Sequence, residues 1–233
     1  MAAAILAVGV GMYAVARETS VFAIDRIEVA GASPDVADRV RAALDPMKGT
    51  SLVVFDAREA NRRLAAVADV AAATYDRNFP NTLRVVVRTE RSVALLRRGH
   101  EAWLASGSAR VIRQVVQGPL PLLPRVWLEP TADPLVGAVL DGPAAVAVHV
   151  VPAIAKARLP IRVRSVRVVD GEVTVTLVSG MQVLLGDTSG LPLKLAAAAR
   201  ILPDVGDMAY LDVSVPERVV AGTRATFNPQ VDS

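Results

Sequence analysis

Residues 70–96, VAAATYDRNFPNTLRVVVRTERSVALL, contain the pattern around which the rest of the chain is organised. Residues 70–75 have the composition of a weak strand, and Asn-Phe-Pro-Asn at residues 78–81 is typical of a turn. In residues 83–88, apolar residues alternate with arginine, as they do in a half-buried strand. Because a two-stranded hairpin is not stable alone in water, we expect a third strand and a helical cover to complete it.

The residues before this hairpin supply the missing parts. Residues 21–30 carry apolar side chains at strand spacing and end at Gly31. A helix is predicted to follow, with Ser33 as its N-cap and Pro34 in the first turn, where no amide donor is needed. Its inward face is expected to contain Val36, Val40 and Leu44, before Pro46 ends the pattern.

A second helix is predicted to begin at Asp56. Asp56 and Glu59 have the spacing of a capping box, in which Asp56 caps the helix and Glu59 reaches back. Its inward side chains are expected to be Ala60, Leu64 and Val67. The order strand, helix, helix, strand, strand over residues 21–91 predicts an open three-stranded sheet with both helices on one face.

Residues 92–222 predict a second domain, an antiparallel sheet with flanking helices, so the fold class is α+β. A hairpin over residues 93–105 comes first, and the proline-rich residues 117–124 indicate an extended connector, after which we place the domain interior. The further predicted elements are a helix from Pro143 that Pro152 kinks or ends, strands 161–169 and 172–177 joined by Asp170-Gly171, a strand at 181–185, a helix over 191–202 capped by Ser189 or a neighbour, a strand over 210–215, and a C-terminal tail, residues 223–233.

Residues 2–16 carry no charge and are followed at once by Arg17. As a helix they cover about 24 Å, somewhat less than the hydrocarbon core of about 30 Å, and they predict a transmembrane anchor over residues 1–17. A secretory signal cleaved after Ala16 is the alternative, and an ordinary buried helix is a third interpretation that fits the glycines poorly. Either of the first two interpretations places the remaining chain across the membrane.

The chain offers few residues for chemistry. The net charge of +3 is too small to indicate nucleic acid, and the absence of cysteine excludes disulfides and thiolate metal sites. His100 and His149 have no second ligand at metal spacing, and no nucleophile motif or phosphate loop is present. The arginines at 97, 98, 162, 164 and 167 could face an acidic partner or anionic lipid, although exposed strand faces explain them as well. These observations predict an exported, membrane-tethered binding protein without a cofactor.

The chain resembles the bacterial division protein family FtsQ, also called DivIB. The likeness is spread over residues 1–221, and Phe79 and Pro80 lie in a hairpin that matches the aromatic-Pro-x-Thr-Leu segment of the family. The other matching residues are Gly49, Leu52, Asp56, Val70, Arg77, Thr82, Leu83, Val85, Val87, residues 180–186, Lys194, Leu195 and residues 211–216.

The resemblance implies a short cytoplasmic tail, one span, a membrane-proximal POTRA domain and a β domain whose final strands recruit FtsB and FtsL. The implied protein is a non-catalytic divisome scaffold in the plasma membrane at the septum, with its C-terminal bulk extracytoplasmic, that helps to position septal peptidoglycan synthesis. Its partners would be FtsB/FtsL-type proteins and the membrane, not nucleic acid. A POTRA-containing component of an envelope assembly or secretion system is the alternative, and a wall-modifying enzyme is a third reading that lacks a nucleophile and base.

The implied mechanism is addition of a partner strand to a C-terminal edge over residues 210–221. Residues 210–215 alternate as a strand does and come last by chain order, so they can form the edge. Beyond Pro216 only residues 217–221 have strand character, so this edge is expected to be short. Tyr210 is the proposed anchor, with a buried structural tyrosine as the alternative. The predicted partner-binding residues are Lys194, Tyr210, Leu211, Asp212, Val213, Val215, Val219 and Val220.

Overall fold

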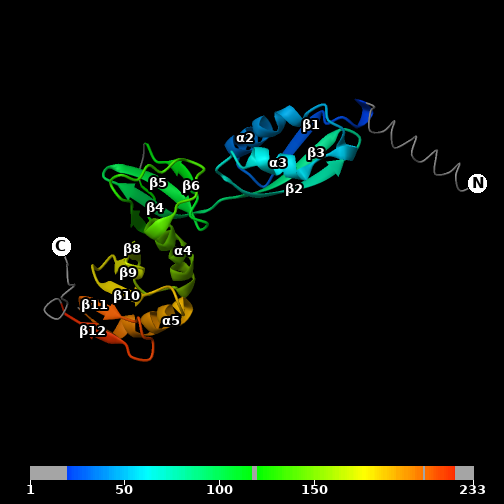
Figure 1. Ribbon diagram of the computed structural model, residues 1–233. Helices are drawn as coiled ribbons and strands as arrows, with labels where there is room; N and C mark the ends of the chain where they lie inside the picture. Colours follow the sequence, from blue (N-terminus) through cyan, green and yellow to red (C-terminus); the bar gives the residue numbers. More distant parts are fainter. Residues whose placement is uncertain (1–19, 117–119, 207, 224–233) are drawn as a thin grey trace, which may run out of the picture. The chain divides into compact units, whose positions relative to one another are not determined.

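The computed structural model describes residues 20–116, 120–206 and 208–223. The chain divides between Glu90 and Arg91 into two compact units (Figure 1). The expected anchor over residues 1–17 and almost all of the expected tail lie outside the described residues. Within the described ranges, no helix is both long and apolar enough to cross a membrane.

The first unit has the predicted order of strand, helix, helix, strand, strand. Its elements are β1 (Arg26–Ala30), α2 (Pro34–Leu44), α3 (Ala57–Leu64), β2 (Val70–Asn78) and β3 (Thr82–Thr89), with short 3₁₀ turns η1 (Ser20–Phe22), η2 (Asp45–Met47) and η3 (Leu52–Val54). The sheet order is β1-β3-β2, in which β3 pairs parallel with β1 and antiparallel with β2. The central strand of this sheet is therefore the second strand of the hairpin that the sequence indicated.

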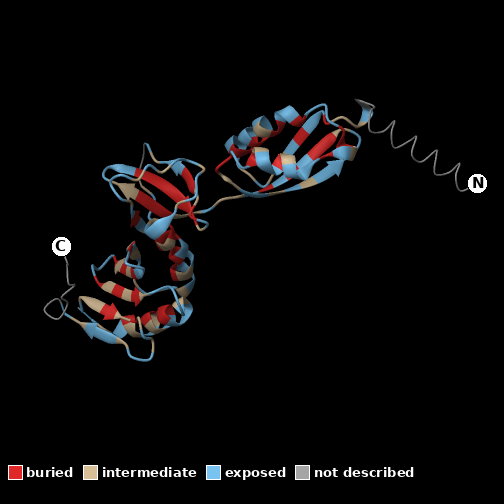
Figure 2. Cartoon of the chain, in the orientation of Figure 1, coloured by how far each residue is buried: buried red, intermediate tan, exposed pale blue. Residues whose placement is uncertain are grey.

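The core of the first unit lies between the helices and one face of β3. Side chains alternate along β3, so that Leu83, Val85 and Val87 are buried while Arg84 and Val86 are exposed (Figure 2). The helices contribute the side chains predicted to face inward, namely Val36, Val40, Leu44, Ala60 and Leu64, together with Val67 just beyond α3. Burial of each large aliphatic side chain stabilises the fold by about 1.5–3 kcal/mol. The spacing of the apolar residues along each element thus decided which of its faces is buried.

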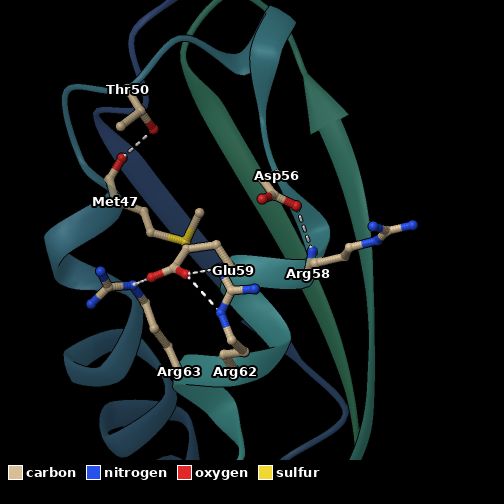
Figure 3. Close-up of polar contacts among 7 residues, drawn as sticks. All are labelled: Met47, Thr50, Asp56, Arg58, Glu59, Arg62 and Arg63. Carbon is tan, nitrogen blue, oxygen red and sulfur yellow. Dashed lines mark hydrogen bonds and ion pairs between the residues drawn. The ribbon is translucent and has the colours of Figure 1, made fainter.

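The start of α3 follows the prediction in one respect and departs from it in another. The Asp56 carboxylate accepts a hydrogen bond from the Arg58 amide at 2.8 Å, which confirms the N-cap. Glu59 does not reach back to the cap. Its carboxylate pairs with Arg62 and Arg63 instead (Figure 3), and the hydrogen bond from Arg62 is the main cause of its lowered pKa. The prediction that Glu59 completes the capping box is therefore wrong, because side chains three and four positions along a helix are closer partners for its carboxylate.

Two further expectations for this unit need correction. Ser33 occupies the N-cap position of α2, but its side chain makes no capping hydrogen bond. The first strand is also shorter than residues 21–30, because the chain before Arg26 pairs with a loop and not with the sheet. The Ile24 amide donates to the Thr50 carbonyl at 2.9 Å, and the Gly49 amide donates to the Ile24 carbonyl at 2.9 Å.

The second unit is built on one nine-stranded sheet. Its elements are β4 (Ser92–Arg98), β5 (Glu101–Ser106), β6 (Val111–Gln114), β7 (Arg125–Trp127), α4 (Gly142–Ala157), β8 (Val163–Val169), β9 (Glu172–Leu177), β10 (Gln182–Gly186), α5 (Leu191–Ile201), the 3₁₀ turn η4 (Leu202–Asp204), β11 (Tyr210–Asp212) and β12 (Val220–Gly222). The strand order is β12-β11-β10-β9-β8-β7-β4-β5-β6. The β4–β7, β7–β8 and β10–β11 pairs are parallel, so the sheet is mixed and not antiparallel throughout as expected.

The core of this unit lies between the sheet and the helices α4 and α5. It includes Ala94 and Leu96 of β4 and Trp103 of β5. The expectation that the interior begins after residue 124 is therefore wrong. The proline-rich segment does not separate two bodies, because Leu120 and Leu123 pack against a small cluster of Leu95, Ala102, Leu104 and Ile112.

Two local predictions in this unit have clear outcomes. Pro152 lies inside α4, and the helix continues past it to Ala157. The turn between β8 and β9 has φ of 51° at Asp170 and 82° at Gly171. Two successive positive φ angles are what a two-residue hairpin turn of the Asp-Gly type requires, and the predicted β8–β9 hairpin is confirmed.

Candidate protein interface

The sheet of the second unit ends at β12, a strand of three residues. β11 pairs parallel with β10 on one side, and on the other side it pairs antiparallel with β12, with Leu211 opposite Ala221. No strand within the described ranges pairs with the outer side of β12. The expected edge over residues 210–221 is therefore wrong for residues 210–215, since β11 is an inner strand. It is confirmed for Val220 and Ala221, which belong to the terminal strand β12 (Figure 1).

Local hydrogen bonds reverse the chain between β11 and β12. The Val213 amide still donates to the Leu184 carbonyl at 2.9 Å, and the Asp212 carboxylate accepts from the Ser214 amide at 2.9 Å. The Arg218 amide then donates to the Val215 carbonyl at 2.9 Å, which closes a turn with Pro216 at its second position. Proline suits that position because its fixed φ matches the turn. The chain consequently returns antiparallel along β11.

The opposite end of the sheet is covered by the chain itself. The Val111 amide of β6 donates to the Ala138 carbonyl at 2.8 Å, and the Val111 carbonyl accepts from the Gly137 amide at 2.8 Å. Arg110 also forms a bridge with Val139. Part of the β6 edge is thus occupied by residues 137–140, so of the two terminal strands β12 is the better candidate to receive a partner strand.

The predicted partner-binding residues differ widely in exposure. Leu211 and Val213 are fully buried in the core and Lys194 is 5% exposed, so these side chains face inward in this structure. Val215 is 53% and Val220 is 45% exposed, and these are the predicted residues that a partner could contact directly. Tyr210, Asp212 and Val219 are half-buried. The structure therefore brings the eight residues into one region but exposes few of them fully.

Lys194 holds the loop that precedes α5. Its ammonium donates to the Asp187 carboxylate at 2.6 Å and to the Asp187 carbonyl at 2.9 Å. The hydrogen bond from Lys194, assisted by the Ser189 hydroxyl, lowers the pKa of Asp187 to about 2. The cap of α5 was expected at Ser189 or a neighbour, and the neighbour Gly190 is the N-cap residue, although no side chain makes a capping hydrogen bond. Lys194 is thus a positioning residue for this loop.

The two histidines of the chain both lie on the surface of the second unit. His100 lies exposed in the turn between β4 and β5, and His149 lies on the exposed side of α4. In the part of the chain that the structure describes, no three His, Cys, Asp or Glu side chains are grouped to hold a metal ion.

The fold thus defines a mixed α+β protein with a small three-stranded unit followed by a larger sheet that ends in an open strand. The family model "POTRA domain, FtsQ-type" matches residues 22–91, which is the whole of the β-α-α-β-β unit. Residues 22–91 are therefore a POTRA domain of the FtsQ type, and the resemblance to the FtsQ/DivIB family is confirmed for this domain. POTRA domains of this type are generally non-catalytic modules for protein interaction in cell division. No curated protein matches the chain.

Proposed function

We propose that this protein is a non-catalytic scaffold of the bacterial divisome that binds FtsB/FtsL-type partners by strand addition at β12. The observation that carries the proposal is the FtsQ-type POTRA domain at residues 22–91, followed in the same chain by a sheet with an open terminal strand. The proposal places the protein in the plasma membrane by a single span, with both units extracytoplasmic at the septum, where it helps to position peptidoglycan synthesis.

The length of β12 limits what backbone pairing alone can contribute. A partner strand bonded to the three residues Val220–Gly222 gains only a few hydrogen bonds. Each is worth about 0.5–1.5 kcal/mol net, because the same groups bond to water when the partner is absent. Specific binding therefore also needs apolar contacts, and Val215 and Val220 are exposed beside the edge to supply them.

The alternative is a component of an envelope assembly or secretion system that binds through the POTRA domain itself. The observation that favours it is β2, a nine-residue strand at the edge of the three-stranded sheet, most of whose residues are exposed. This edge is longer than β12 and uses the same backbone chemistry. The two functions therefore differ in which unit of the chain holds the partner.

Replacement of Val220 by proline tests the first proposal. Proline removes an amide donor and fixes φ, so Val220→Pro should disrupt pairing at β12 while the core remains intact. The matched control is Val136→Pro, which changes a valine of similar exposure at the second position of a turn closed by the Ala138 amide and the Leu135 carbonyl. We expect at least about a tenfold loss of co-purified FtsB/FtsL-type partner with Val220→Pro, equal to about 1.4 kcal/mol, and none with Val136→Pro.

Two results would contradict the proposal. Undiminished partner binding by a folded Val220→Pro chain would remove β12 from the interface. A uniform envelope signal from a fluorescent fusion in dividing cells, in place of enrichment at midcell, would separate the protein from the divisome altogether.

A further inference from the structure

The second unit contains an apolar groove at the C-terminal end of α4, away from β12. Its cavity volume is about 380 Å³, and it is bounded by α4, the starts of β4 and β8, and the segment before β7. Val151 and Ile154 of α4 form a buried part of its wall. Leu122, which is 81% exposed, stands at its margin. An exposed leucine beside an apolar hollow is unfavourable in water, so the free energy falls when a further apolar group covers this surface.

A second hollow adjoins the groove and continues it. The two share Leu122, Leu123, Arg162 and Val163 as wall residues. The second adds the start of β7, a further residue of β8 and the residue that follows β9. It has a volume of about 330 Å³ and a more polar lining. Together the two hollows form one elongated surface, apolar at the α4 end and polar at the β7 end. We refer to it as the arginine groove.

The charged residues that line the arginine groove are all cations. They are Arg125, Arg158, Arg162 and Arg164, and the described residues of the lining include no aspartate or glutamate. All four arginines are exposed. Arg164 donates a hydrogen bond to the Val178 carbonyl at 2.6 Å, but none of the four forms an ion pair with any described residue.

Other cations of the chain contrast with these four. Arg39, Arg62, Arg63, Arg98 and Lys194 each pair with a carboxylate of the chain. Like charges gathered along a groove repel one another, and they attract an anionic ligand into it. A guanidinium also binds a carboxylate through two parallel hydrogen bonds, which gives geometric as well as electrostatic selection.

We propose that the arginine groove docks a peptide segment of a partner protein that carries apolar side chains flanked by aspartate or glutamate. The apolar hollow accepts the side chains, and the four arginines pair with the flanking carboxylates. A bilayer also offers anionic and apolar groups, but its surface is flat, whereas this site is concave and of the size of a few side chains. The concavity therefore favours a peptide over anionic lipid.

The arginine groove is a separate surface from the edge in the proposed function. In the sheet order, β8 lies four strands from β12, which corresponds to about 19 Å at the usual spacing between strands. No groove residue belongs to β10, β11, β12 or α5. Failure of one proposal consequently leaves the other untouched.

Binding of a labelled probe peptide to the 233-residue chain tests the inference. The probe is a fluorescein-labelled peptide of about twelve residues with leucines flanked by glutamates, and its counterpart has every glutamate replaced by lysine. The charge reversal Arg158→Glu with Arg162→Glu is compared with Arg167→Glu and Arg200→Glu, two exposed arginines of the same unit outside the groove. We expect the two groove substitutions together to weaken binding of the acidic probe about tenfold or more, and the two control substitutions to change its affinity less than about twofold. The lysine probe should not bind.

A second variant separates docking in the groove from general attraction to positive charge. Ala155 is exposed on α4 and lines the hollow, so Ala155→Trp fills the groove without a change of charge. Ala196→Trp on the exposed side of α5 is its control. Loss of the probe with Ala155→Trp alone supports the inference. Equal binding by both tryptophan variants, or equal loss from both charge pairs, overturns it. Binding to phosphatidylglycerol vesicles that survives Ala155→Trp, without binding of the acidic probe, would instead identify a lipid contact and also overturn it.

Discussion

The two units of this chain use the same kinds of residue but assemble their sheets by different routes. In the first unit, three strands and two helices occur within about seventy residues, and β3 simply inserts between β1 and β2. In the second unit, the three-residue strand β7 joins β4 to β8, and β11 joins β10 to β12. Short strands of this kind carry too few residues to show a period. The comparison teaches that strand order in the second unit depends on packing more than on any local pattern.

The largest expected effect comes from cutting a cavity into either core. Leu83 of β3 and Leu211 of β11 are both fully buried, and each belongs to a cluster whose members come from one unit alone. Leu83→Ala and Leu211→Ala should each lower the free energy of unfolding of their own unit by about 3–5 kcal/mol. Hydrogen exchange followed by mass spectrometry measures this for each unit. Faster exchange throughout β8–β10 in Leu83→Ala would show that the two units are not energetically separate.

The next effect compares two glycines with the same φ of 82°, one from each unit. A Cβ at Gly31 would lie 2.3 Å from the Val87 carbonyl oxygen of β3, whereas a Cβ at Gly171 meets no atom within 4 Å. Gly171→Ala should lower the free energy of unfolding by about 1 kcal/mol, from backbone conformation alone. Gly31→Ala should cost about 2–4 kcal/mol, because the sheet must also shift. Urea denaturation of both variants measures the difference, and equal costs would mean that β1 and β3 separate easily.

A smaller effect distinguishes the two helix starts of the POTRA domain. Asp56 makes a capping hydrogen bond to the Arg58 amide, and Ser33 makes none. Asp56→Ala should therefore lower the free energy of unfolding by about 1 kcal/mol, and Ser33→Ala by less than about 0.5 kcal/mol. The same denaturation experiment applies. A larger loss at Ser33 would indicate that its hydroxyl caps α2 in solution.

The smallest effect is a pH dependence confined to the second unit. The pKa of Asp187 is lowered to about 2 by the hydrogen bond from Lys194, while an unfolded aspartate has a pKa of about 3.9. The pair thus stabilises the fold fully above about pH 4, and this contribution is lost as the pH falls towards 2. Asp187→Asn should be less stable than the wild type at pH 7 and nearly equal to it at pH 2. Denaturation at several pH values measures this, with Asp204→Asn, an exposed carboxyl of η4, as the control.

The sequence by itself determined most of the longer elements and their buried faces. The alternation along residues 83–88, the helical spacing of Val36, Val40 and Leu44, and the Asp170-Gly171 turn are all local signals, and the structure follows each of them. The resemblance to the FtsQ/DivIB family likewise depended on residues along the chain, and the POTRA match confirms it for residues 22–91. The length of the open edge was also foreseen, since little strand character follows Pro216.

Only the tertiary structure decided which strand forms the open edge and which side chains it exposes. Residues 210–215 alternate as an edge strand would, yet β12 pairs with β11, and Leu211 and Val213 face the core. The arginine groove has the same origin, because Arg125, Arg158 and Arg162 become neighbours only when β7, α4 and β8 pack together. Periodicity reports how each segment divides between core and solvent. It carries no information about which segments are adjacent, because that depends on the free energy of packing the whole sheet at once.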